Sequence, residues 1–84
     1  MMNKYMVFVC GPQPMKNMME YYLDRIMVIE ATDEEMAKTK YTVELSGWLR
    51  RNEVGHLTAI KTDAKTPYMA VKEAREYMKS KGWT

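Results

Sequence analysis

The chain has 84 residues, of which 46% are hydrophobic and 29% charged, and its formal net charge at pH 7 is +2. This length predicts one globular domain over residues 1–84, because a divided chain would leave pieces too small to build a core. The composition excludes a disordered chain, and no apolar run approaches the roughly 20 residues that span a bilayer, so we expect a soluble protein without a membrane partner.

Cys10 and His56 are the sole cysteine and the sole histidine. One cysteine excludes an intramolecular disulfide, and the pair cannot supply the four ligands of a structural zinc site. A free thiol without a secretion signal predicts a cytoplasmic protein. We expect neither a metal nor a cofactor.

The first elements alternate between strand and helix. The run Lys4–Cys10 is apolar on both faces, which predicts a strand covered on both sides. Pro14 suits the first position of a helix, and the apolar residues behind it recur at helical spacing, so we expect a helix over 14–24. The β-branched run at 26–31 predicts a second strand.

Thr32 begins a capping box that ends at Glu35, and we expect a single helical turn at 33–38. Tyr41–Arg50 alternates between apolar and polar residues, which predicts a half-buried strand. Residues 51–55 then form a hairpin loop with Gly55 at a positive φ, and 56–61 returns as the partner strand.

The last element is a helix with Thr66 as N-cap, Pro67 at the first helical position and Gly82 just beyond its end. The element order is therefore β-α-β-β-β-α. It predicts a small α+β fold, a two-layer sandwich with an antiparallel or mixed sheet of about four strands. Both helices are expected on one face, which leaves the other face of the sheet partly open.

Catalytic chemistry has few candidates. Cys10 ends a strand before a loop and a helix, as in cysteine phosphatases, but Lys16 stands where those enzymes have arginine. Two prolines in this loop also lack the N–H donors of a phosphate cradle. A buried structural cysteine is the preferred interpretation, and His56 is expected to be a solvated residue at a strand end. We expect no catalytic residue and no enzyme, with a Cys10 enzyme kept as the third hypothesis.

Residues 48–84 carry eight Lys/Arg against four Asp/Glu, whereas residues 1–47 carry five against seven. The basic half mixes cations with aromatic rings, a composition that can stack bases and neutralise phosphates. Two other interpretations stay open: Trp48 lies under a helix among ordinary surface cations, or it anchors a protein interface. The candidate binding residues of this half are Trp48, Arg50, Arg51, Lys61, Tyr68 and Lys72.

Methionine is over-represented, with ten residues in the chain. Its flexible, polarizable side chain fills irregular cores and also suits adaptable interfaces. The stripe of Met15, Met18 and Met19 is therefore either core or a surface for a partner or for self-association.

These features favour a small non-enzymatic binding protein that engages or inhibits another macromolecule, either a protein or a protein–nucleic acid complex. In size and character the chain is similar to accessory, possibly anti-defence, proteins of phages and mobile elements. The alternative is a module that binds an anionic ligand, a nucleotide or a nucleic acid through its basic, aromatic C-terminal half. A homodimer is also expected, because so short a chain gains stability by burying a spare sheet face against a second copy.

Overall fold

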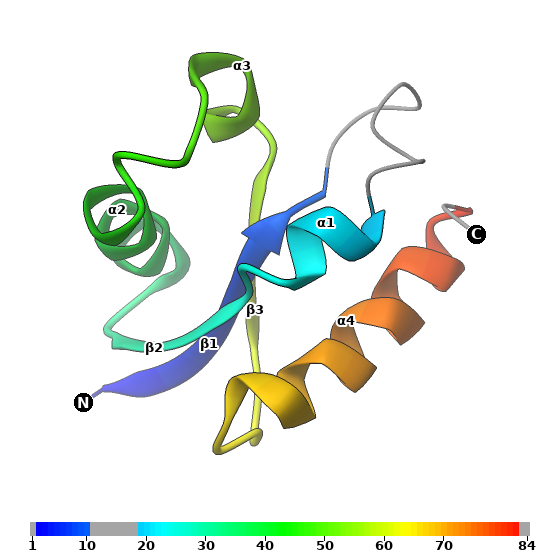
Figure 1. Ribbon diagram of the computed structural model, residues 1–84. Coiled ribbons are helices and arrows are strands. Elements are labelled where there is room, and N and C mark those ends of the chain that lie inside the picture. The colour runs from blue at the N-terminus through cyan, green and yellow to red at the C-terminus, as the bar shows by residue number, and fades with distance from the viewer. Residues whose placement is uncertain (1, 11–18, 83–84) are drawn as a thin grey trace.

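The computed structural model describes residues 2–10 and 19–82 and contains three strands and four helices in these ranges (Figure 1). The first part of the helix expected over 14–24, with Met15 and Met18, lies outside the described residues. In chain order the elements are β1 (Asn3–Val9), α1 (Met19–Leu23), β2 (Met27–Ala31), α2 (Glu34–Glu44), α3 (Arg51–Val54), β3 (Leu57–Lys61) and α4 (Pro67–Ser80).

The sheet is antiparallel with strand order β2-β1-β3, so β1 is the central strand. Tyr5 lies opposite Ile29 of β2 on one side and opposite Lys61 of β3 on the other. All residues from Tyr5 to Val9 are buried, which confirms the prediction of a first strand covered on both faces. The α+β class is confirmed, but the described residues form three strands and four helices where about four strands and two helices were expected.

Helices cover both faces of the sheet, so the prediction of an open face is wrong. In Figure 1, α2 lies on one side of the strands, and α1 and α4 lie on the other. Phe8 faces α4, where its ring meets Tyr77 edge-on with the ring centroids 6.1 Å apart. An ion pair between Arg75 and Glu20 joins α4 to α1 at 2.7 Å.

The strand expected over Tyr41–Arg50 is wrong: its first four residues form the last turn of α2, and residues 45–50 form a turn and an irregular segment. The buried residues of α2, Ala37 and Tyr41, lie four positions apart, which is helical spacing, whereas Val43 is 70% exposed. The apparent alternation of period two was therefore coincidental. Tyr41 is fully buried against the sheet core, and burial of this ring outweighs the strand preference of its neighbours.

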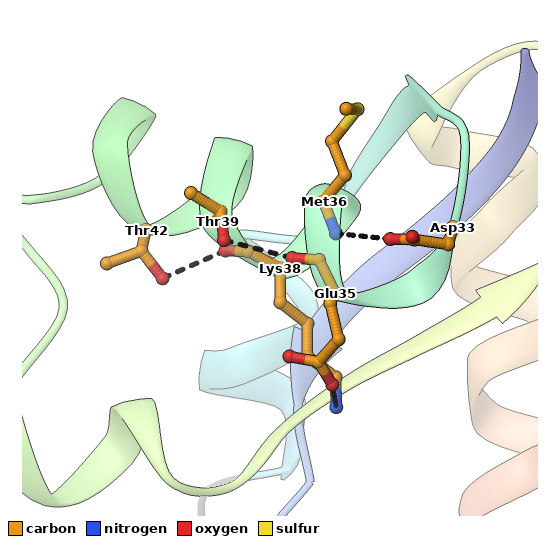
Figure 2. Close-up of polar contacts among 6 residues, drawn as sticks. All are labelled: Asp33, Glu35, Met36, Lys38, Thr39 and Thr42. Carbon is orange, nitrogen blue, oxygen red and sulfur yellow. Dashed lines mark hydrogen bonds and ion pairs between the residues drawn. The ribbon is translucent and has the colours of Figure 1, made fainter.

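Two threonines of α2 satisfy their hydroxyl groups on the backbone of the same helix. Thr39 donates to the Glu35 carbonyl oxygen at 3.0 Å and Thr42 donates to that of Lys38 at 2.9 Å (Figure 2). Asp33 is the N-cap, and its Oδ1 accepts from the backbone N–H of Met36 at 2.8 Å. The predicted Thr32 cap is therefore wrong by one position, and the helix runs well beyond the single turn expected.

Around β3 the expected elements are partly confirmed. Residues 51–55 do not form a hairpin loop but contain the single turn of α3, and Gly55 has a φ of −69° instead of a positive value. In α4, Thr66 caps the N-terminus and Pro67 follows it, as predicted. Gly82 has a φ of +80° just after the end of α4, which confirms the role assigned to it.

Candidate functional site

The predicted binding residues of the basic half lie in two separate places. Trp48, Arg50 and Arg51 precede β3, at α3, whereas Lys61 and Tyr68 follow at its other end, where α4 begins (Figure 1). The five residues of β3 hold the two groups apart at about 3.3 Å per residue. Lys72 is exposed further along α4, and Met19 belongs to α1. The structure thus brings together only the first group.

Trp48 is the centre of an aromatic cluster. It is half-buried and packs against the core. Its ring lies 5.5 Å from that of Tyr21 at an interplanar angle of 34°, and Tyr22 meets it edge-on at 6.3 Å. The guanidinium carbon of Arg25 lies 5.5 Å from the centroid of the Trp48 ring, which is a cation–π distance. Trp48 is thus both a packing residue and part of a surface.

A buried hydrogen bond fixes the base of this cluster. The Tyr22 hydroxyl donates to Glu53 Oε2 at 2.7 Å, and the backbone N–H of Arg50 donates to Glu53 Oε1 at 2.9 Å. Burial, reinforced by the Glu53 carboxylate, raises the pKa of Tyr22 to about 12. The Tyr22 hydroxyl therefore stays protonated and serves as a donor over the physiological range.

The indole of Trp48 has a buried polar atom. Its Nε1 is buried without a hydrogen-bond partner in the described part of the structure. A buried, unpaired donor costs about 1–3 kcal/mol. The ring contacts with Tyr21, Tyr22 and Arg25 offset this cost and keep the ring where it is. We define the aromatic–arginine surface as Tyr21, Arg25, Trp48 and Arg50.

Sequence reasoning found Trp48 and Arg50 but missed Tyr21 and Arg25. Tyr21 is 45% exposed, whereas Tyr22, whose ring it contacts, is buried. Arg25 follows α1 in a turn and is exposed. The signal available in the sequence was the pair Tyr21-Tyr22 on a short helix, because adjacent helical residues point in different directions and can therefore differ in exposure.

A second surface lies on the outer side of α2. Met36 and Val43 are 39% and 70% exposed, and Val54 of α3 is 41% exposed. Val43 borders two grooves, one shared with Met27 and Ile29 of β2 and the other with Val54 and Leu57. We call Met36, Val43 and Val54 the apolar ridge. The sequence did not predict this ridge, because Val43 lies in the alternating run Tyr41–Arg50, which predicted a half-buried strand.

A third feature is a cleft where β1, β3 and α4 meet. It has a volume of about 670 Å³, and lysines and carboxylates both line it: Lys4, Lys61, Lys65, Asp63 and Glu73. Thr62 donates to Glu73 at 2.6 Å, which holds one carboxylate in the wall. The mixed charges give the cleft no clear preference for a cation or an anion.

Cys10 and His56 lie on paired segments, since the Cys10 backbone N–H donates to the His56 carbonyl oxygen at 2.9 Å. The thiol itself is half-buried, and this burial raises its pKa, an effect that Lys81 opposes. A raised pKa disfavours the thiolate, which is the nucleophilic form. The environment of Cys10 is thus that of a packed thiol.

Comparison with known proteins gives no relative: no protein-family model, no curated protein and no solved structure matches the chain. Over residues 2–10 and 19–82, His, Cys, Asp and Glu nowhere gather in a group of three or more that could hold a metal ion. In the same ranges, the helices are too short or too polar to cross a membrane.

Proposed function

We propose that this chain is a small non-catalytic binding protein that engages another protein through the apolar ridge. The observation that supports it is the exposure of Val43, an aliphatic side chain that is 70% exposed on a well-formed helix. Neighbouring exposed apolar residues, such as Val43 and Val54 in one groove, are typical of interaction sites. Met36 lies seven positions before Val43 on α2, and Val54 shares a groove with Val43.

The surroundings of the ridge favour a protein as the partner. Its rim carries both signs of charge, with Lys38 and Glu35 paired at 3.6 Å on one side and Lys40 and Glu44 beside the other groove. An apolar centre with a mixed polar rim is the usual composition of a protein interface. A polyanion such as nucleic acid would instead require a surface of predominantly positive charge.

This role is that of an accessory protein that binds or inhibits its target. The apolar ridge replaces the open sheet face as the proposed binding surface. Because α2 covers that face, a partner must contact the outside of the helix. A second copy of this chain is one such partner, since the ridge of one protomer can pack against that of another about a two-fold axis.

Photo-crosslinking tests the proposal. A photoreactive amino acid at Val43 should yield one defined product in cells that express the chain, and excess unlabelled chain should compete it away. The control position for the photoreactive amino acid is Lys79, which is exposed on α4 at the other side of the sheet and should give less product. Val43→Glu with the photoreactive residue at Met36 should abolish the product without changing the thermal midpoint.

The mass of the product identifies the partner class. Twice the mass of the chain supports self-association, and a larger or different increment supports a separate protein. Products of equal yield at Val43 and Lys79, or a product insensitive to Val43→Glu, would contradict the apolar ridge as a binding surface.

A further inference from the structure

The outer ring of the aromatic–arginine surface is available for stacking. Tyr21 continues the stack that begins at Trp48, with 5.5 Å between ring centroids and planes tilted by 34°. It is 45% exposed, although both its neighbours in the cluster are more buried. An aromatic ring that is held on one side and open on the other is the arrangement that base-stacking proteins use.

The support beneath Tyr21 is rigid. Tyr22 meets Tyr21 edge-on at 5.4 Å, and the bond from Tyr22 to Glu53 ties α1 to α3. Trp48 contacts both tyrosine rings, and its Nε1 is buried without a hydrogen-bond partner in the described residues. A preorganised ring loses little entropy when a ligand stacks on it, so this support increases affinity.

The charge that faces outward here is positive. Arg25 and Arg50 are both exposed, and Arg51 follows Arg50 at the start of α3. The Glu53 carboxylate is buried and engaged by two donors, so it does not compete for a ligand. Asp24 is exposed next to Arg25 and Glu20 is exposed next to Tyr21, but Arg75 of α4 pairs with Glu20 at 2.7 Å. Arg25, Arg50 and Arg51 then outweigh the charge of Asp24. Arginine guanidinium groups suit phosphates because they present several donors in one plane.

We propose that the aromatic–arginine surface binds single-stranded nucleic acid, with one base stacked on Tyr21 and neighbouring phosphates held by Arg25 and Arg50. This site is separate from the apolar ridge and does not depend on the proposed protein partner. It also revises the residues expected from the sequence: Tyr21 and Arg25 join Trp48 and Arg50, while Lys61, Tyr68 and Lys72 are not part of it.

An unpaired strand fits this surface better than a duplex. In a duplex the bases are already stacked on one another and are not available to a protein ring, whereas an unpaired base can be splayed out onto an aromatic side chain. Within residues 2–10 and 19–82, this surface is built from the short helices α1 and α3 and the turns beside them, whereas an element that reads a major groove is usually a longer helix or a two-stranded ribbon.

A fluorescence titration tests the inference. The probe is a labelled single-stranded deoxyadenosine oligonucleotide of about eight nucleotides, within the site sizes of single domains. Tyr21→Ala should weaken its binding about five- to a hundredfold, as expected for one lost base stack, and Tyr21→Phe should restore it because the ring remains. In a Trp83→Phe background, the fluorescence of Trp48 should also change on binding.

Salt dependence tests the arginines. For single strands the slope of log K against log salt is about −0.7 for each phosphate neutralised, so Arg50→Ala should reduce its magnitude by about 0.7. Arg25→Ala should do the same. Lys72→Ala, which removes a cation from α4, serves as the matched control and should leave both affinity and slope unchanged.

Further probes separate this site from simple ion exchange. The matching duplex and inorganic polyphosphate should each bind at least tenfold more weakly than the single strand, and an RNA version reports whether the 2′-hydroxyl contributes. Equal binding of polyphosphate, loss of binding in Tyr21→Phe, or unchanged binding in Tyr21→Ala would each overturn the proposal. So would the absence of oligonucleotide binding at low salt, whatever the result of crosslinking at Val43.

Discussion

The Tyr22 hydroxyl donates a 2.7 Å hydrogen bond to Glu53 Oε2 across 31 positions of sequence. The two residues are only 1% and 5% exposed, so water cannot replace either partner. Tyr22→Phe should therefore lower the free energy of unfolding by about 1–3 kcal/mol, as measured by urea denaturation. Tyr21→Phe is the matched control and should change it by less than about 0.5 kcal/mol. Equal effects would contradict a structural role for this bond.

The same hydroxyl makes stability sensitive to alkaline pH. Burial and the Glu53 bond raise the pKa of Tyr22 from 10.0 to about 12, and burial also raises the pKa of Tyr41. The unfolded chain therefore loses these protons first, and the stabilisation is complete below about pH 10 and lost as the pH rises through 12. Thermal midpoints measured across this window should fall with pH. A fall of the same size in Tyr22→Phe would show that other groups cause it.

The capping assignment predicts a difference between two adjacent residues. Asp33 accepts from the backbone N–H of Met36, whereas the Thr32 hydroxyl donates to the Met36 sulfur at 3.6 Å. Asp33→Ala should cost about 1 kcal/mol of stability, and Thr32→Ala should cost clearly less. Chemical denaturation of the two variants measures the difference. A larger effect at Thr32 would restore the capping box expected from the sequence.

Cys10 provides a test of the enzyme hypothesis. Because burial raises the pKa of its thiol, alkylation by iodoacetamide at neutral pH should be slow in the folded protein and faster in urea. Lys81→Ala should slow the reaction further, since Lys81 lowers the pKa of the thiol. Rapid alkylation of the native chain would instead indicate an activated nucleophile and would reopen the case for catalysis.

Local signals were enough to predict the first and the last element of the chain. The apolar run of β1 has no other stable solution than burial on both faces, and Thr66, Pro67 and Gly82 mark the ends of α4 through their own backbone preferences. The segment 41–50 was mispredicted as a strand because Thr and Val favour strands locally. The deciding contact, burial of Tyr41 against the sheet, is tertiary and leaves only a faint spacing in the sequence.

The candidate site was predictable only where its residues are close together in the sequence. Trp48 and Arg50 are close in sequence and drew attention as a pair. Tyr21 and Arg25 reach them only through the fold, because α1 packs beside the turn that holds Trp48. Charge and aromatic content gave no means of separating this group from Lys61 and Tyr68 at the far end of β3.

The order of the strands has a consequence for the growing polypeptide on the ribosome. The central strand β1 precedes both its partners, and Val9 meets Leu57 only after most of the chain exists. Until then, one hydrogen-bonding edge of the most apolar strand has no native partner. A chain that stops before residue 57 should show fast hydrogen exchange at the β1 amides, and nascent chains of this length are the stage at which chaperone contact would matter most.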